Sequence, residues 1–140
     1  MEDEEIKKLL EKKLRELMSR SRGDTINMKK HGLIYEVTDE NFNELVIKRS
    51  YEVPVIVDFW AFWCAPCLIL GPILEKIVKE LNGSVVLAKV NVDRCPLLVS
   101  QFGIMSIPTV MLFKNGKVVD SFIGALSEGL VRRWLMKHIK

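Results

Sequence analysis

The sequence predicts an α/β fold, in which a central mixed β-sheet carries helices on both faces. The first observation is that short apolar runs alternate with helix-like stretches from about residue 33 onward, and strands joined by helices pair in parallel. The second is Asn115-Gly116, which separates two later strand-like runs and is the strongest short signal of a β-hairpin. The hairpin adds an antiparallel pair at the edge of the sheet.

Length and composition favour one domain without a membrane span. The chain has 140 residues, of which 49% are hydrophobic and 28% charged, enough for one core and too few for two domains of ordinary size. No apolar run approaches the roughly 20 residues that cross a bilayer. The net charge of +3 is spread evenly, with nine basic and seven acidic residues in 1–32 and twelve and eleven in the remainder. We therefore expect no nucleic-acid interface.

An amphipathic helix is predicted over residues 4–18, ahead of the domain. Its apolar residues recur at spacings of three and four between charged side chains, and they are Ile6, Leu9, Leu10, Leu14, Leu17 and Met18. Residues 19–32 are polar and contain two glycines, so we expect a linker there. This divides the chain into a helical extension with its linker, residues 1–32, and a domain, residues 33–140. The apolar stripe favours packing on the domain or self-association over a contact with a partner or a membrane surface.

The domain begins with a strand and a helix. We expect a strand over residues 33–37, followed by a helix that Thr38 or Asp39 caps and that ends near Lys48. The apolar run over residues 53–60 then predicts a buried strand.

A long helix and a second buried strand come next. The helix covers residues 64–81 and ends at Asn82-Gly83, a dipeptide suited to the left-handed conformation at a helix end. Residues 84–92 are apolar enough for a buried strand, and residues 96–102 predict a short helix.

The last part of the domain contains the hairpin and one more helix. Strands are expected over residues 109–113 and 117–123, on the two sides of the Asn115-Gly116 turn. Ser127 then caps a final helix that reaches about His138.

The motif Trp63-Cys64-Ala65-Pro66-Cys67 lies where a buried strand passes into the long helix. Residues three apart in a first helical turn lie roughly 5 to 6 Å apart, a separation that a disulfide accepts. A thiol at a helix N-terminus also meets the positive end of the helix dipole and free amide donors, which lower its pKa. Cys64 is therefore the candidate nucleophile, and Cys67 is the thiol that resolves the intermediate.

Redox chemistry is favoured over a metal site. The first residues, Met1-Glu2-Asp3-Glu4-Glu5, are acidic and unlike the basic start of a signal peptide, so we expect a cytoplasmic protein. In that setting a CxxC pair indicates redox or metal chemistry. Zinc needs four ligands, and only Cys95, His31 and His138 remain to complete a set. We expect no metal, and we expect Cys95 to be a partly buried, unpaired thiol.

An ordered set of motifs runs through the domain: Val57-Asp58-Phe59-Trp60-Ala61, Trp63-Cys64-Ala65-Pro66-Cys67, Ile107-Pro108-Thr109, Phe113-Lys114-Asn115-Gly116 and Gly124-Ala125. In order and spacing this set resembles the thioredoxin family, and the resemblance covers about Leu33 to Lys140. It implies the thioredoxin fold and a thiol–disulfide oxidoreductase that reduces protein disulfides through Cys64 and Cys67. It also implies a thioredoxin reductase as electron donor, because the chain has no flavin or nicotinamide fingerprint and no cofactor is expected.

Asp58 and Lys89 complete the catalytic site that the resemblance implies. Asp58 stands among apolar strand residues, where an ionised carboxylate is costly unless it is paired or protonated. The resemblance places it buried behind Cys67, where it moves a proton to or from that thiol. Lys89 matches the family's lysine partner of this carboxylate. The alternatives are an exposed edge position for Asp58 and a solvated strand position for Lys89.

The resemblance further implies a rim around Cys64 that docks the substrate protein, formed by Trp63, Ala65, Pro66, Ile107, Pro108, Gly124 and Ala125. Ile107-Pro108 matches the family's cis peptide bond, and a cis bond would leave the Ile107 backbone free to pair with an extended segment of the partner. Two departures make the surface more apolar, because Phe62 and Leu68 stand where many family members have charged residues.

Two other functions remain open at this point. A disulfide isomerase or oxidant of the same fold would have a reduction potential close to that of an oxidising compartment. A binding module that docks a partner through the N-terminal helix would not accelerate the reduction of a protein disulfide.

Overall fold

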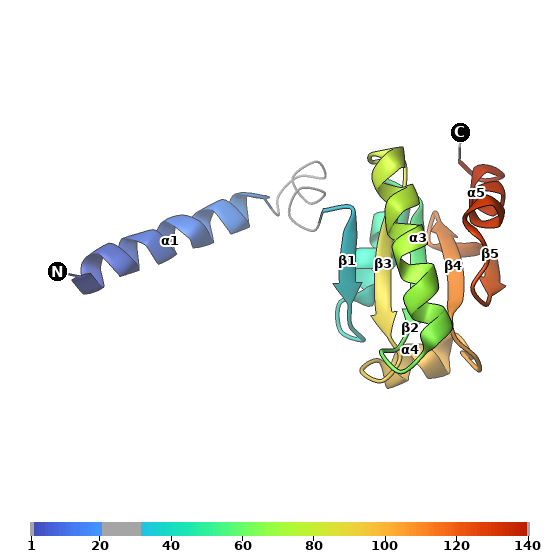
Figure 1. The fold of residues 1–140 in the computed structure, drawn as a ribbon. Helices are drawn as coiled ribbons and strands as arrows, with labels where there is room; N and C mark the ends of the chain where they lie inside the picture. The colour runs from blue at the N-terminus through green and yellow to red at the C-terminus, as the bar shows by residue number, and fades with distance from the viewer. Residues whose placement is uncertain (1, 21–31, 140) are drawn as a thin grey trace. The chain divides into compact units, whose positions relative to one another are not determined.

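The computed structural model describes residues 2–20 and 32–139, and it describes side chains for residues 4–13 and 32–139. The chain forms two compact units, residues 1–32 and 33–140 (Figure 1). Most of the predicted linker, residues 21–31, and with it His31, lies outside the described residues, as do the side chains of Leu14, Leu17 and Met18.

The first unit contains one helix, α1 (Glu2–Arg20). The helix is longer at both ends than the predicted 4–18, so Ser19 and Arg20 are helical rather than part of a linker. Ile6, Leu9 and Leu10 are exposed. Within the described ranges, no helix is both long and apolar enough to cross a bilayer.

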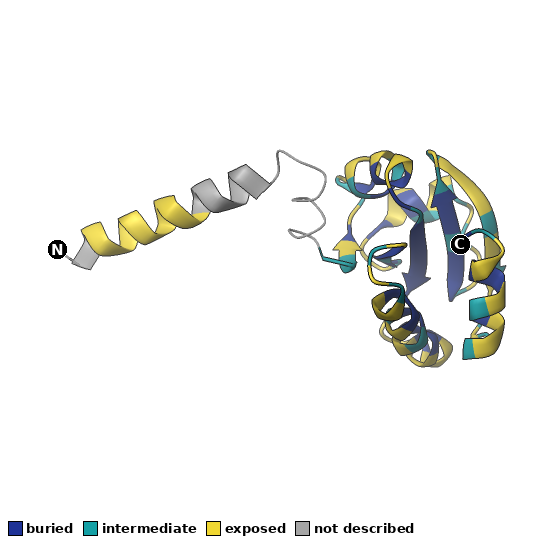
Figure 2. Ribbon diagram, turned by 90° about the horizontal axis from the view of Figure 1, so that it is seen from above, coloured by how far each residue is buried: buried dark blue, intermediate teal, exposed yellow. Residues whose placement is uncertain are grey.

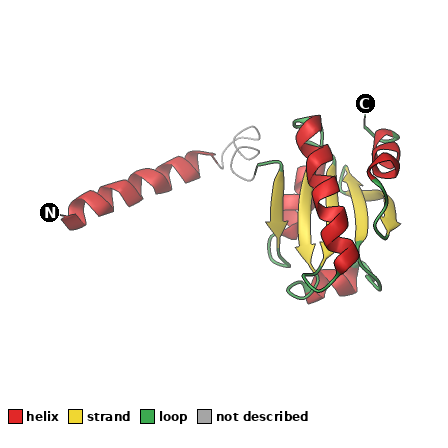
Figure 3. Ribbon diagram, viewed as in Figure 1, coloured by secondary structure: helices red, strands yellow, loops and turns green. Residues whose placement is uncertain are grey.

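The second unit is built on a mixed five-stranded sheet in the order β1-β3-β2-β4-β5. The strands are β1 (Ile34–Val37), β2 (Val55–Trp60), β3 (Val86–Asn91), β4 (Thr109–Lys114) and β5 (Lys117–Ile123). β3 pairs in parallel with both β1 and β2, whereas β4 is antiparallel to β2 and to β5. The predicted mixed sheet is confirmed, and β2 lies at its centre (Figure 3).

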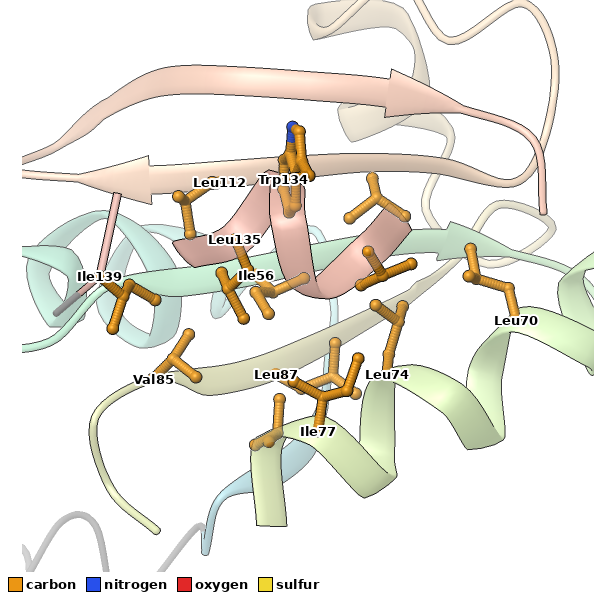
Figure 4. Packing of buried hydrophobic residues seen from close by; sticks show 13 residues of the cluster. Ile56, Leu70, Leu74, Ile77, Val85, Leu87, Leu112, Trp134, Leu135 and Ile139 are labelled. Carbon is orange, nitrogen blue, oxygen red and sulfur yellow. The ribbon is translucent and has the colours of Figure 1, made fainter. Parts of the chain in front are cut away.

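Each face of the sheet carries its own core. On one face, α3 (Ala65–Leu81) and α5 (Glu128–Met136) enclose an aliphatic cluster, and Figure 4 shows Leu74 and Ile77 of α3 among its members. On the other face, rings from four separate segments lie with centroids 5.5 to 6.1 Å apart, and they are Phe42, Phe59, Phe102 and Phe113. The three inner strands, β2, β3 and β4, are largely buried between these layers, whereas the edge strand β5 is mostly exposed (Figure 2).

The alternation of β2 decides where its one charged side chain points. All six residues of β2 are buried, and successive strand residues face opposite sides of a sheet. Ile56 belongs to the aliphatic cluster under α3, whereas Phe59 contacts the aromatic rings of the other face. Asp58, two residues after Ile56, therefore faces α3.

The predicted ends of helices and strands are largely confirmed where a capping or turn residue determines them. Asn82 ends α3 with a left-handed φ of 41°. Ser127 caps α5, because its Oγ accepts a hydrogen bond from the Leu130 amide at 3.3 Å. Asn115 and Gly116 have φ values of 52° and 82°, as the tight turn of this hairpin requires. The short helix α4 (Pro96–Gln101) also lies where it is predicted.

The helix predicted over 38–48 is different in type, and it both begins and ends later in the chain. It consists of a π-helix, η1 (Asn43–Lys48), followed by a 3-10 turn, η2 (Arg49–Tyr51). Its end is tied to the hairpin, because the Asn115 amide donates to the Ser50 carbonyl at 2.9 Å and the Gly116 amide donates to Ser50 Oγ at 2.8 Å. These tertiary hydrogen bonds, which local sequence patterns do not reveal, extend the helix beyond Lys48.

Candidate active site

The two cysteines lie at the start of α3, directly after the central strand. Only residues 61–64 separate β2 from α3. Cys64 is the N-cap of the helix, and its Sγ accepts a hydrogen bond from the Cys67 amide at 3.2 Å. The Cα atoms of Cys64 and Cys67 are 5.3 Å apart and the pair forms a disulfide. The predicted spacing therefore brings the two thiols together.

Asp58 is buried behind this disulfide, and the alternative of an exposed edge position is wrong. Its exposed fraction is 1%, and β2 is not an edge strand, since it has neighbours on both sides. Neither carboxyl oxygen has a hydrogen-bond partner in the described part of the chain. Burial raises the pKa of Asp58 from its ordinary value to about 7, while Lys89 lowers it and Glu75 raises it.

Lys89 lies beside Asp58 but forms its hydrogen bond elsewhere. The two residues are register partners on the parallel strands β2 and β3. The Lys89 ammonium group, however, donates to Glu75 Oε2 at 3.3 Å, and it lies 5.0 Å from the centroid of the Trp60 ring. The lysine is thus near the carboxyl group of Asp58 without being hydrogen-bonded to it.

Glu75 is the member of this group that sequence reasoning missed. Cys67, Gly71 and Glu75 follow one another at four-residue spacing on α3, so they share the helix face that covers Asp58 and Lys89. A Cβ atom at Gly71 would lie 3.7 Å from Lys89 Nζ, which is ordinary van der Waals contact. The four-residue spacing after Cys67 was the signal that could have identified Glu75.

These polar groups line one pocket of about 280 Å³ between α3 and the sheet. Its walls are formed by Asp58, Trp60, Phe62, Cys67, Leu68, Gly71, Pro72, Glu75 and Lys89. Phe62 and Leu68 are exposed, at 68% and 53%, and the Phe62 ring lies 4.6 Å from the Trp60 ring between centroids. The surface beside the cysteines is therefore apolar, as the two departures from the family pattern predict.

Of the predicted rim residues, Ile107 packs against the buried cluster that contains Cys64. Trp63 and Ile107 line a second pocket of about 320 Å³, together with Val92, Val99, Ile104, Met105 and Ser106, which sequence reasoning missed. The Ile107 carbonyl oxygen lies 3.7 Å from Cys64 Sγ. The Trp63 indole nitrogen donates to Asp93 Oδ2 at 3.0 Å. Asp93 lies in the loop after β3, so this hydrogen bond holds the Trp63 ring against that loop.

The remaining rim residues come from three segments. Ala65 and Pro66 are exposed in the first turn of α3. The Ile107-Pro108 peptide bond is cis, as the resemblance implies. Pro108 is buried, and its carbonyl accepts a hydrogen bond from the Gly124 amide at 2.9 Å, which brings the segment of Gly124 and the exposed Ala125 next to it.

The other candidate ligands lie elsewhere in the domain. Cys95 is a buried free thiol that donates to the Val37 carbonyl at 3.7 Å, and burial raises its pKa. His138 Nε2 lies 2.8 Å from Asp120 Oδ2, within hydrogen-bonding distance. Among the side chains that the structure describes, no group of three or more histidine, cysteine or acidic residues is arranged to hold a metal ion.

Comparison with known proteins gives one consistent result. The family model described as Thioredoxin matches residues 33–137. A thioredoxin of Rickettsia bellii is 47% identical over 103 residues, covering 74% of this chain and 96% of that protein. A thioredoxin of Chlorobaculum thiosulfatiphilum is 42% identical over 108 residues, covering 77% of this chain and 98% of that protein. Thioredoxin 1 of a Nostoc species is 42% identical over 104 residues, covering 74% and 95%.

Replacing Asp58 by asparagine is expected to stabilise the oxidised protein at neutral and alkaline pH. The folded state holds the pKa of Asp58 at about 7, above its ordinary value. The folded protein therefore binds this proton more tightly than the unfolded chain, and its stability falls as the pH rises from about 4 to about 7. The gain from Asp58→Asn is absent near pH 4 and reaches up to about 4 kcal/mol at pH 8.

Equilibrium unfolding in denaturant at a series of pH values measures this gain. A change in the free energy of unfolding that is the same at pH 4 and pH 8 would contradict a raised pKa for Asp58.

Proposed function

Because the chain belongs to the thioredoxin family, we propose that its two active-site thiols have unequal roles, with Cys64 as the attacking thiol and Cys67 as the resolving thiol. Thioredoxins are protein-disulfide oxidoreductases, and this protein exchanges dithiol for disulfide through Cys64 and Cys67. The family acts on protein disulfides with a thioredoxin reductase as the source of electrons.

In the first step of the proposed mechanism, the Cys64 thiolate attacks one sulfur of a partner disulfide. A bond forms between Cys64 and that sulfur, and the second partner sulfur leaves as a thiolate. The single observation that supports this role is the N-cap geometry, because the Cys67 amide already donates to Cys64 Sγ at 3.2 Å. A hydrogen bond to sulfur and the positive end of the α3 dipole stabilise a thiolate more than a thiol.

In the second step, Cys67 releases the partner. Asp58 takes the proton of the Cys67 thiol, and the resulting thiolate attacks Cys64. The Cys64–Cys67 disulfide forms, the mixed disulfide breaks, and the partner leaves with both of its sulfurs reduced. A buried carboxyl group with a pKa of about 7 is suited to this transfer, because it exchanges its proton near neutral pH. Lys89 is the charged neighbour that tunes this carboxyl group.

The apolar rim is proposed as the docking surface. Trp63 and Ile107 line a pocket next to Cys64, and the segment with Gly124 lies beside Pro108. An extended strand of the partner, carrying its disulfide, would pair with the backbone at Ile107 and lie across Ala65, Pro66 and Ala125. A cytoplasmic location is part of this proposal, since the reductive direction needs a reducing compartment.

Replacing Cys67 by serine is expected to trap partners. Cys67→Ser removes the thiol that resolves the mixed disulfide, so covalent adducts accumulate through Cys64 and disappear on treatment with a reductant. Non-reducing electrophoresis and mass spectrometry of the adducts give the measurement. Cys95→Ser, at the buried free thiol, is the matched control and traps nothing. Adducts that persist in the Cys64→Ser/Cys67→Ser double variant would show that the assigned nucleophile is wrong.

We also propose that the N-terminal helix associates with a second copy of itself. Ile6, Leu9 and Leu10 recur at helical spacing on α1 and are exposed, each above 50%, and an apolar stripe of this kind is buried when two helices pack.

Removing the helix is therefore expected to change the oligomeric state. Sedimentation equilibrium should give a larger assembly for the full chain and a monomer for a chain that begins at His31. The same mass per assembly for both chains would refute self-association through α1.

A further inference from the structure

We propose that Glu75 is a positioning residue of the active site: it holds the Lys89 ammonium group against α3 and so leaves the Asp58 carboxyl group without a directly bonded counter-charge. The proposal concerns the state of Asp58 and rests on the proposed role of Asp58 in proton transfer only for its functional consequence.

The first observation is that Lys89 is hydrogen-bonded to Glu75 and not to Asp58. Lys89 and Asp58 are register partners on adjacent strands, and both line the pocket of about 280 Å³ beneath α3. Neighbouring strands lie about 4.8 Å apart, so the side chains of such neighbours are close enough to pair. The ammonium group nevertheless bonds to Glu75 Oε2 at 3.3 Å, and both oxygens of Asp58 are left without a partner among the described residues.

The second observation is that the surroundings favour this arrangement of Lys89. The Trp60 ring lies 5.0 Å from the ammonium nitrogen, within the range of a cation–π contact. Gly71, one turn before Glu75 on α3, presents no side chain toward the ammonium group, and a Cβ there would stand 3.7 Å from the nitrogen. The side chains of Lys89 and Glu75 are 19% and 34% exposed, so water screens their attraction less than it would at the open surface.

The third observation concerns every charged or titratable group that faces Asp58. β3 contributes Lys89, and α3 contributes Cys67 and Glu75. On β4, the register partner of Asp58 is Val110, which carries no charge. Burial, the largest influence, raises the pKa of Asp58; Lys89 lowers it and Glu75 raises it. Among the described residues that line this pocket, Lys89 is the one cation, so its position decides how far burial is compensated.

The consequence is a stronger base behind Cys67. A carboxylate bonded directly to an ammonium group holds a proton weakly and ionises well below neutral pH. With Lys89 held by Glu75, Asp58 instead binds and releases a proton near neutral pH, where the Cys67 thiol must be deprotonated. Glu75 therefore acts on the reaction through Lys89 and Asp58 without touching the reacting sulfur atoms.

The test is the titration of the Asp58 carboxyl carbon by NMR in the full, oxidised chain, in which neither Cys64 nor Cys67 titrates. Glu75→Gln frees Lys89 to bond Asp58, and the midpoint is expected to fall by about one pH unit or more. Glu80→Gln is the matched control, because Glu80 lies on the same helix and pairs with Arg132, and it should leave the midpoint unchanged. An unchanged or higher midpoint in Glu75→Gln overturns the proposal.

A second comparison separates positioning from the simple loss of a negative charge. In a Lys89→Gln background, Glu75→Gln should move the midpoint by much less than it does in the natural chain, because no ammonium group remains to be released. A shift of equal size in both backgrounds overturns the positioning role.

The pH dependence of the resolving step then tests the function separately. The rate measured is that at which Cys67 resolves a mixed disulfide between Cys64 and a partner. If the pH midpoint of this rate in Glu75→Gln follows the shifted midpoint of Asp58, both the positioning role of Glu75 and the role of Asp58 as proton acceptor are supported. If the Asp58 midpoint falls but the pH profile of this rate does not move, the positioning by Glu75 stands and the proposed base role of Asp58 is wrong.

Discussion

The short connection between β2 and α3 is the constraint on which the active site depends. β2 is buried at the centre of the sheet, and α3 packs directly over it. With only residues 61–64 between them, the first turn of the helix lies over the end of the strand. Cys64 becomes the N-cap, Cys67 turns inward, and Asp58 faces the same helix from below. The same packing that stabilises the core thus sets the geometry of the thiols.

The buried carboxyl group of Asp58 lowers the stability of the folded protein when it is ionised. A carboxyl group at the centre of a sheet, with neither oxygen bonded in the described part of the chain, is destabilising when ionised. The aliphatic cluster on the α3 side and the ring cluster on the other provide the surrounding stability. Perturbed carboxyl groups of this kind are typical of catalytic sites, and in the proposed mechanism this one exchanges a proton with Cys67.

Local sequence patterns predicted most of the fold because the residues at turns and helix ends determine these features through their own backbone and side chains. The turn at Asn115-Gly116 requires residues that tolerate positive φ, and Asn82 and Ser127 supply helix ends through their own backbone or side chains. The ordered motifs also predicted the Cys64–Cys67 pair and the burial of Asp58. The patterns failed where distant segments decide, as at η1 and η2, whose end is fixed by the hairpin. The bond from Lys89 to Glu75 depends on the register of β3 against β2 and on the pitch of α3, which no short motif encodes.

The N-cap position of Cys64 should make the two thiols unequal. Alkylation of the reduced protein with iodoacetamide over a range of pH, with the modified residue located by mass spectrometry, measures this inequality. Cys64 is expected to react first, with a midpoint below the ordinary thiol pKa of about 8.5. Modification of Cys67 ahead of Cys64, or equal rates with an ordinary midpoint at both, would contradict it.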